Sequence, residues 1–147
     1  MMYNKLPRGA IYLPANGGRT YELGAMKAVF KADEAETNQR YSISEWWLDP
    51  YTDGPGAHSH ENNHDIFYVL EGIASILIHD TWIDASSGSF ILIPEHTIHD
   101  FKNKSGSLLK LLNFFIPGGF EHNMPAVVNW FRENKPQIEL GTATPNA

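Results

Sequence analysis

A polar turn with two closely spaced histidines leads into an apolar run in residues 54–72, which read GPGAHSHENNHDIFYVLEG. His58 and His60 stand two residues apart, and in an extended chain such residues point to the same side. Two imidazoles on one side can chelate one metal ion. Asp65 begins the apolar run after a short turn and returns a carboxylate to the same region. The stretch therefore predicts a metal site at the start of a β-strand.

A third imidazole comes from His99, later in the chain. Three imidazoles and one carboxylate suit a borderline divalent ion and leave one or two positions for water, dioxygen or substrate. We therefore predict His58, His60, Asp65 and His99 as ligands of Fe, Ni, Mn, Cu or Zn, among which the spacing does not choose. His64 is an alternative to Asp65 as fourth ligand, and a site of three histidines alone is a further alternative.

Short runs rich in β-branched and aromatic residues follow one another from about residue 25 to residue 116, separated by Gly, Pro, Asn and Ser. Because no helical pattern separates these runs, they predict an all-β sandwich or barrel. The expected strands are Ala25–Phe30, Tyr41–Leu48, Asp65–Leu70, Ala74–His79, Trp82–Ile83, Phe90–Ile93, Ile98–Phe101 and Leu108–Ile116.

A single helix is expected near the end, over Met124–Glu133, because its apolar residues recur at spacings that cover one face. Pro125 suits a first helical turn. The chain shows no internal repeat and no linker, so we predict one domain over residues 1–147. Its parts are an N-terminal arm over 1–24, a barrel over about 25–116, and a C-terminal helix and tail over 117–147.

Composition excludes several functions. The formal net charge is −6, from 17 acidic residues against 11 Lys and Arg, and no basic run offers a surface for phosphates, so we expect no nucleic-acid partner. The absence of cysteine excludes disulfides, thiolate metal ligands and cysteine nucleophiles. No stretch approaches the roughly 18 apolar residues of a membrane span, and the first residues lack the apolar segment of a secretory signal. We expect no membrane partner and a cytoplasmic location.

Two stretches of the chain match paired motifs of one family. The first motif has the form Gly-x5-His-x-His-x3,4-Glu-x6-Gly; it is matched by His58, His60 and Gly72, with Asp65 in place of the Glu. The second, Gly-x5-Pro-x-Gly-x2-His-x3-Asn, is matched by Gly88, Pro94, His99 and Asn103. Over about residues 40–116 the chain thus resembles the cupin superfamily. This resemblance implies a double-stranded β-helix, also called a jelly-roll barrel, and a homodimer that takes a small-molecule substrate.

Three positions depart from the motifs. Thr52 stands where the first motif opens with Gly, although Gly54 and Gly56 can supply the same turn. His96 replaces the Gly of the second motif, and Asp65 replaces the Glu of the first. An Asp side chain is shorter than Glu by one carbon–carbon bond, about 1.5 Å. The last departure therefore bears on how closely the carboxylate approaches an ion.

Other side chains are expected around the ligands. Phe67 and Val69 face the same side as Asp65 by strand alternation, so we expect them to wall an apolar pocket. Such a pocket favours an aromatic or other largely apolar substrate. His64 and His96 are expected in the pocket or in contact with the ligands, with a surface loop as the alternative for His96.

Residues 58–72 and Phe115–Glu121 also resemble the quercetinase-type single-domain cupins. That resemblance implies a metal-dependent dioxygenase, an oxidoreductase acting on a small aromatic or enolisable compound, with Asp65 as general base. Two other functions stay open: a redox-neutral metal-dependent isomerase or lyase, which we expect to place Arg or Lys in the pocket, and a non-enzymatic cupin that binds a small ligand. In the arm, the apolar residues at 11–13 either add a strand to a partner's sheet or pack on their own barrel.

Overall fold

The computed structural model describes residues 4–5 and 9–134, and nearly half of them lie in β-strands. The strands are β1 (Asn4–Lys5), β2 (Ile11–Tyr12), β3 (Arg19–Leu23), β4 (Met26–Ala32), β5 (Ser42–Leu48), β6 (His64–Glu71), β7 (Ile73–Ile78), β8 (Thr81–Ser86), β9 (Phe90–Ile93), β10 (His99–Lys102) and β11 (Leu109–Ile116). The helices are α1 (Glu34–Thr37), the 3-10 helix η2 (Phe120–Asn123) and α2 (Met124–Asn134).

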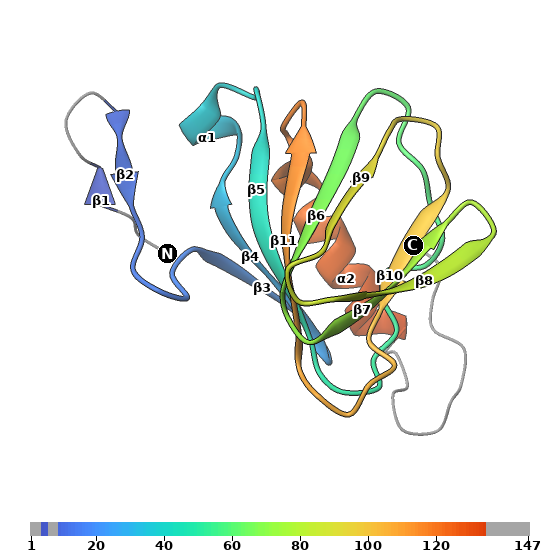
Figure 1. Cartoon of the computed structure of the whole chain (residues 1–147). Helices are drawn as coiled ribbons and strands as arrows, with labels where there is room; N and C mark the ends of the chain where they lie inside the picture. The colour runs from blue at the N-terminus through green and yellow to red at the C-terminus, as the bar shows by residue number, and fades with distance from the viewer. Residues whose placement is uncertain (1–3, 6–8, 135–147) are drawn as a thin grey trace.

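Two antiparallel sheets make up the barrel (Figure 1). The larger sheet has the strand order β3-β4-β5-β11-β6-β9, and the smaller has the order β10-β7-β8. Aromatic rings fill the space between them: Phe101 of the smaller sheet meets Trp46 and Phe67 of the larger, with ring centroids 6.0 and 5.5 Å apart. The predicted all-β barrel with a short C-terminal helix is confirmed.

Side chains alternate between the inside and the outside of the barrel along the strands. On β11 the residues Leu109, Leu111, Asn113 and Phe115 are buried, while those between them are more exposed. Burying a side chain such as Leu or Phe contributes about 1.5–3 kcal/mol. A slip of one residue in the pairing would send all of these side chains to the solvent, so the alternation fixes the strand register.

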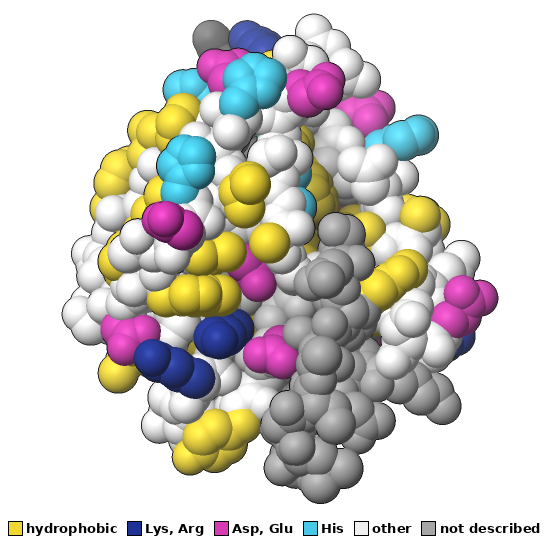
Figure 2. Space-filling view, turned by 90° about the vertical axis from the view of Figure 1, so that its right-hand side faces the viewer, with side chains coloured by type: hydrophobic (Ala, Val, Ile, Leu, Met, Phe, Trp, Pro, Cys, Tyr) yellow, Lys and Arg dark blue, Asp and Glu magenta, His cyan; other side chains and the backbone are white. Residues whose placement is uncertain are grey.

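The outer side of β6 is apolar as well. Tyr68 and Leu70 are exposed there, and Tyr68 pairs with Phe90 of β9, which is also exposed. Leu92, the next outward residue on β9, is exposed and lies opposite Ile66. Figure 2 views the molecule from the side on which β8 and β10 lie and shows hydrophobic side chains gathered over part of that surface. The six-stranded sheet thus carries an apolar outer face at its β9 edge.

The predicted C-terminal helix is present as α2. Met124 and Phe131 are its buried residues and join the core of the barrel. It follows η2 directly, and the sequence did not predict η2 or the short helix α1. Because each is a single turn of four residues, its apolar pattern is too short to recognise.

The larger sheet begins earlier than predicted. β3 pairs with β4 from Arg19 opposite Phe30 to Leu23 opposite Met26, and it lies within the segment expected as an arm. β3 is an edge strand of the sheet, and only Leu23 of its five residues is buried, so it lacks the run of apolar residues that predicts a strand. Ahead of β3, strands β1 and β2 pair with each other and stand away from the barrel (Figure 1). The predicted tail after residue 134 lies outside the described residues.

Candidate metal centre

Four predicted ligands come together at one end of the barrel interior. Asp65 is on β6 and His99 begins β10, while His58 and His60 lie in the loop between β5 and β6. The loop is held by its backbone, since the amides of His58 and His99 each donate to the carbonyl of the other, at 3.0 and 2.8 Å. We call His58, His60, Asp65 and His99 the histidine group. It draws on three separate segments of the chain.

The group is compact enough to share one ion. One ligand atom from each residue lies within 4.8 Å of all the others. Two ligands that each bind an ion at about 2.1 Å lie at most about 4.2 Å apart. Movements of about half an ångström therefore close the group around a cation. Asp65 is 5% exposed and His99 is 1% exposed, so the site lies below the surface.

The imidazoles of His58 and His99 are oriented by the backbone. Nδ1 of His58 lies 2.7 Å from the carbonyl oxygen of Gly56, and Nδ1 of His99 lies 2.8 Å from that of Thr97. A carbonyl can only accept, so each Nδ1 carries the proton and donates. Nε2 of each ring then faces the group with a lone pair, which is the arrangement found in metal-binding histidines.

Nε2 of His99 lies 3.0 Å from the carboxylate oxygen Oδ2 of Asp65. With Nδ1 donating to Thr97, a neutral His99 would present a lone pair to a negative oxygen. Such a contact requires a positive charge, which either a proton or a metal ion supplies. Accordingly, burial lowers the pKa of His99, but the Asp65 carboxylate and the Thr97 carbonyl together outweigh burial and raise the pKa overall.

Asp65 is held in its ionised form. Burial raises its pKa, but the imidazoles of His60 and His99 and the amide of Asn113 outweigh burial and lower the pKa below its usual value. Burial lowers the pKa of His58 to about 4, so this imidazole is neutral at physiological pH and offers its lone pair. The group thus combines a carboxylate anion with a neutral imidazole, as a divalent cation requires.

His60 supplies the strongest sign that the histidine group binds a ligand. Its Nε2 atom is buried and has no hydrogen-bond partner among the described residues, although it lies 3.4 Å from Oδ2 of Asp65. A buried polar atom without a partner costs about 1–3 kcal/mol. A metal ion bound by the group would satisfy this atom. The donor set and this orphaned nitrogen therefore fit a divalent transition metal.

A cavity of about 200 Å³ opens beside the histidine group. Its other walls are mostly apolar and include Trp46, Phe67, Phe101, Phe120 and Val127. None of the described residues that line it is Lys or Arg. An apolar cavity with a few polar groups at one end suits a small, uncharged organic molecule.

Three other predicted residues do not join the group. His64 faces the opposite side of β6; its side chain is 45% exposed and its Nε2 lies 3.6 Å from Glu95, so it is not placed as a fourth ligand. Val69 is fully buried, as parity predicts, but it packs in the core and does not line the cavity. The side chain of His96 is exposed, and only its backbone approaches the group: its amide donates a hydrogen bond to the carbonyl of His60, at 2.7 Å.

The structure explains two of the motif departures. His96 has φ of +65°, a left-handed conformation that glycine adopts without strain, which accounts for the Gly of the family motif. The turn before His58 depends on Gly54, because a Cβ atom there would lie 1.8 Å from the carbonyl oxygen of Phe101. Gly54 therefore takes over the requirement for glycine that the motif places at Thr52.

Asn113 is a candidate site residue that was not predicted from the sequence. It lies on β11 and its side-chain amide donates to Oδ1 of Asp65 and to the carbonyl of Ile66. Its signal was present, since it is the polar residue at an inward position of an otherwise apolar strand. Phe120 was also missed, because η2 was not predicted.

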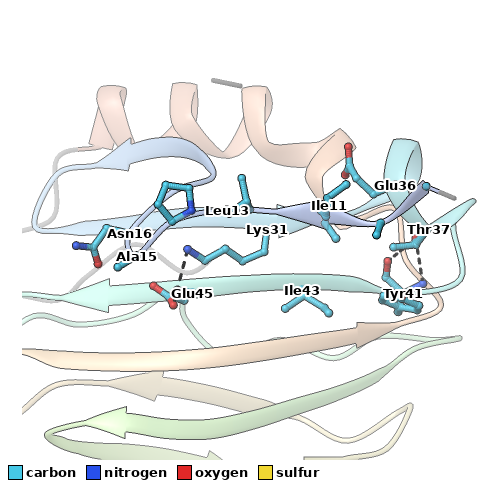
Figure 3. A pocket seen from close by; sticks show the side chains of 14 residues that line it. Ile11, Leu13, Ala15, Asn16, Lys31, Glu36, Thr37, Tyr41, Ile43 and Glu45 are labelled. Carbon is cyan, nitrogen blue, oxygen red and sulfur yellow. Dashed lines mark hydrogen bonds and ion pairs between the residues drawn. The ribbon is translucent and has the colours of Figure 1, made fainter. Parts of the chain in front are cut away.

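A larger cavity of about 600 Å³ lies between the N-terminal arm and the outer side of β4 and β5 (Figure 3). Its polar groups contact one another: Lys31 lies 3.9 Å from Glu45, and the hydroxyl of Thr37 donates to the carbonyl of Tyr41. In the described part of the chain, the histidine group is the one cluster of three or more metal-ligating side chains. We therefore take the smaller cavity as the candidate functional site.

A model of the cupin domain family matches residues 45–124, which is more than half of the chain. The chain belongs to the cupin family. This cupin has no match among curated proteins. The helices in its described residues are all too short to cross a membrane.

Solved structures share the fold at low sequence identity. KdgF from a Halomonas species is 15% identical with a TM-score of 0.65, over 76% of this chain and 96% of that one. A predicted oxalate decarboxylase from Thermotoga maritima is 16% identical with a TM-score of 0.66, over 72% and 98%. Oxalate decarboxylase from Bacillus subtilis, which has Mn(II) centres, is 18% identical with a TM-score of 0.62, over 71% and 29%. At these identities the likeness concerns the fold alone.

Proposed function

We propose that this cupin is a metal-dependent dioxygenase that acts on a small aromatic or enolisable compound. The observation that carries the proposal is the histidine group with its orphaned Nε2 of His60, placed at the end of an apolar cavity. When bound, a divalent ion supplies positive charge for a substrate oxygen and, where it is redox-active, the electron transfer that a reaction with dioxygen requires.

The side chains of the cavity divide the remaining work. His58, His60, Asp65 and His99 would hold the ion, and Asn113 holds the carboxylate of Asp65 in place. The aromatic walls bind the apolar part of the substrate and exclude water. A general-base role for Asp65 remains a prediction, and its lowered pKa disfavours it, because a carboxylate with a low pKa accepts protons poorly.

The redox-neutral isomerase or lyase is the weaker candidate. Substrates of that class often carry carboxylates or phosphates, and we expected Arg or Lys to bind them. The described residues that line the cavity include neither. An acid such as oxalate would place its second negative charge in an apolar environment next to Asp65, which is unfavourable.

The test combines metal analysis with oxygen uptake. Natively purified protein should contain one metal ion per chain, and protein reloaded with Fe, Ni, Mn or Cu should consume dioxygen when catechols or enols are added. His60→Ala should lose the metal and the oxygen uptake. His64→Ala is the matched control, because His64 begins β6, directly after the loop that holds His60, but its side chain faces the solvent. Equal, sub-stoichiometric metal in all three proteins would refute the site, and turnover without oxygen uptake would refute the dioxygenase.

A further inference from the structure

The cavity beside the histidine group is small. Its volume of about 200 Å³ compares with about 150 Å³ for an apolar cavity in a protein that binds benzene. It therefore has room for one six-membered ring with its substituents. A compound of two or three fused rings needs a wider cavity.

Phe120 of η2 closes one side of this space. Its ring centroid lies 6.5 Å from that of His60 and 5.0 Å from that of Phe115. On its other side the ring stacks on Phe30, with centroids 6.2 Å apart. This wall is thus contributed by the segment after the last strand, so its position depends on what holds that segment.

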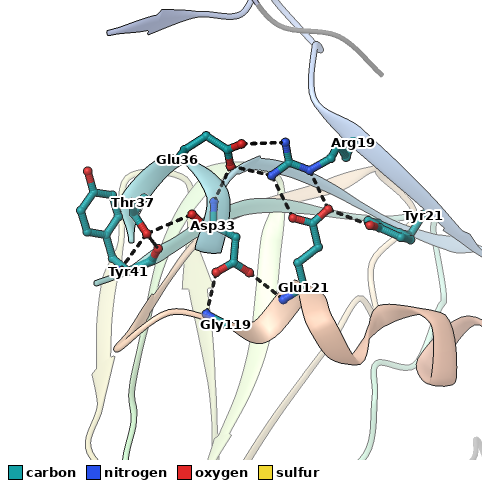
Figure 4. A network of polar contacts seen from close by, with 8 residues as sticks. All are labelled: Arg19, Tyr21, Asp33, Glu36, Thr37, Tyr41, Gly119 and Glu121. Atoms are coloured by element: carbon teal, nitrogen blue, oxygen red, sulfur yellow. Dashed lines mark hydrogen bonds and ion pairs between the residues drawn. The ribbon is translucent and has the colours of Figure 1, made fainter. Parts of the chain in front are cut away.

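Asp33, at the start of α1, holds the backbone on both sides of Phe120 (Figure 4). Its Oδ1 accepts from the amide of Gly119 and its Oδ2 from the amide of Glu121, both at 2.6 Å. Asp33 is 1% exposed. Hydrogen bonds to a buried carboxylate are about twice as strong as those between neutral groups. The position of Phe120 is therefore fixed from a segment far away in sequence.

Contacts to the side chain of Glu121 hold the turn that carries Phe120 as well. The guanidinium of Arg19 donates to Glu121 at 2.7 and 2.9 Å and to Glu36 at 2.7 and 3.2 Å, and the hydroxyl of Tyr21 donates to Glu121 at 2.7 Å. Burial and the Glu121 carboxylate raise the pKa of Tyr21 to about 12, so the hydroxyl keeps its proton. We call Arg19, Tyr21, Asp33, Glu36 and Glu121 the Arg19 network.

We propose that Phe120 limits the substrate to single-ring compounds and that Asp33 is the positioning residue that keeps Phe120 in the wall. The inference rests on the proposed function, because it takes this cavity as the substrate site. It goes further by naming the size class of the substrate and the side chain that sets it. The size limit itself is a property of the cavity and does not require the ion.

The test uses phenol and 2-naphthol as probes of the metal-free protein, with binding followed by NMR titration. In the wild type, phenol should bind at least about tenfold more tightly than 2-naphthol, because the second ring does not fit. Phe120→Ala should reverse this preference by opening space for the second ring. Phe90→Ala is the matched control, since it removes the same ring from the outer face and should leave the preference unchanged.

Asp33→Asn tests the positioning role. An asparagine offers one acceptor oxygen where Asp33 offers two, so one of the two flanking amides loses its partner. The preference for phenol over 2-naphthol should fall at least about threefold, while the affinity for Zn(II) stays the same. Arg19→Lys, which keeps the charge but loses the two-sided contact, should shift the preference in the same direction if Asp33→Asn fails to fold. A purely structural role would lower stability without changing the preference.

The outcomes separate the two proposals. Equal binding of both probes by the wild type, or an unchanged preference in Phe120→Ala, overturns the size limit even where metal binding and oxygen uptake are found. An unchanged preference in folded Asp33→Asn or Arg19→Lys overturns the positioning role. Failure to bind metal refutes the proposed function. The size limit can still be tested, because the phenol and 2-naphthol titrations use metal-free protein.

Discussion

The histidine group lies beside the cavity, whereas the Arg19 network holds the turn that carries Phe120 into its wall, and the hydrogen bonding of these two polar clusters differs. In the Arg19 network each carboxylate faces donors, and the positive guanidinium lies between two acidic side chains. Among the described residues, Nε2 of His60 in the histidine group has no hydrogen-bond partner, and the contact between Nε2 of His99 and the carboxylate of Asp65 requires a proton or a metal ion. The first cluster is complete with protein groups alone, whereas the second is completed by a cation. The unsatisfied Nε2 of His60 thus distinguishes the histidine group from the Arg19 network.

The largest effect is expected from removing the one negative charge of the histidine group. Asp65→Asn should weaken binding of Zn(II) or Mn(II) more than about 100-fold, because a carboxylate ligand is replaced by a neutral amide. Competition with a chelator measures this affinity. Unchanged affinity would support the alternative of a site with three histidines alone.

A smaller loss should follow when the support of Asp65 is removed. Asn113→Ala leaves the carboxylate without the amide that orients it and should weaken metal binding about 10–100-fold. Leu112→Ala, the neighbouring outward position on β11, is the control and should bind metal as the wild type does. Equal affinities in both variants would show that Asn113 has no part in the site.

In the Arg19 network the corresponding change should cost stability and spare the metal. Asp33→Asn should lower the free energy of unfolding by about 1–3 kcal/mol, because a buried amide loses its acceptor. Urea unfolding measures this cost. A loss of metal affinity in the folded variant would contradict the division between the two clusters.

The protonation of His99 should make the stability and the metal binding of the histidine group depend on pH. The pKa of His99 is raised in the folded protein. Protonated His99 therefore stabilises the metal-free protein fully below about pH 6.5, and this stabilisation is lost as the pH rises through the raised pKa. The lowered pKa values of His58 and Asp65 contribute the opposite way, but their contribution is already complete above about pH 6.5. An ion must displace the proton of His99, so the rise in Tm on adding Zn(II) should be greater at pH 8 than at about pH 6.5. A rise that shrinks with pH would argue against His99 as a ligand.

The smallest effect should come from the strained residue beside the site. His96→Gly should raise the free energy of unfolding by up to about 1 kcal/mol, because glycine adopts a positive φ without strain. Metal affinity should not change, since the backbone amide that contacts His60 is retained. A loss of affinity would instead assign the imidazole of His96 to the site.

The members of the histidine group could be predicted from the sequence because each is marked by a short pattern of neighbouring residues. His58 and His60 share a face through a spacing of two, and His99 lies at a fixed place in a second motif. Strand alternation also placed Phe67 on the side of Asp65, where it lines the cavity. The barrel and α2 followed from patterns long enough to recognise.

The rest depends on contacts between distant segments. Phe120 reaches the cavity because Asp33 and Arg19 bind the turn that carries it, and no local pattern links these three residues. β3 was missed because it covers a sheet edge with charged residues. Val69 has the parity of a wall residue, but only the course of β6 shows that it lies too deep to reach the cavity.

The apolar outer face near β9 has a consequence for the site, because β6 serves both sides of the sheet. Tyr68 and Leu70 point outward from the strand that holds Asp65 inward. Any molecule that binds this face contacts β6, the strand whose backbone positions the carboxylate of Asp65. By thermodynamic reciprocity, association at that face and cation affinity within the barrel would then depend on each other, and ultracentrifugation with and without Zn(II) would measure their coupling.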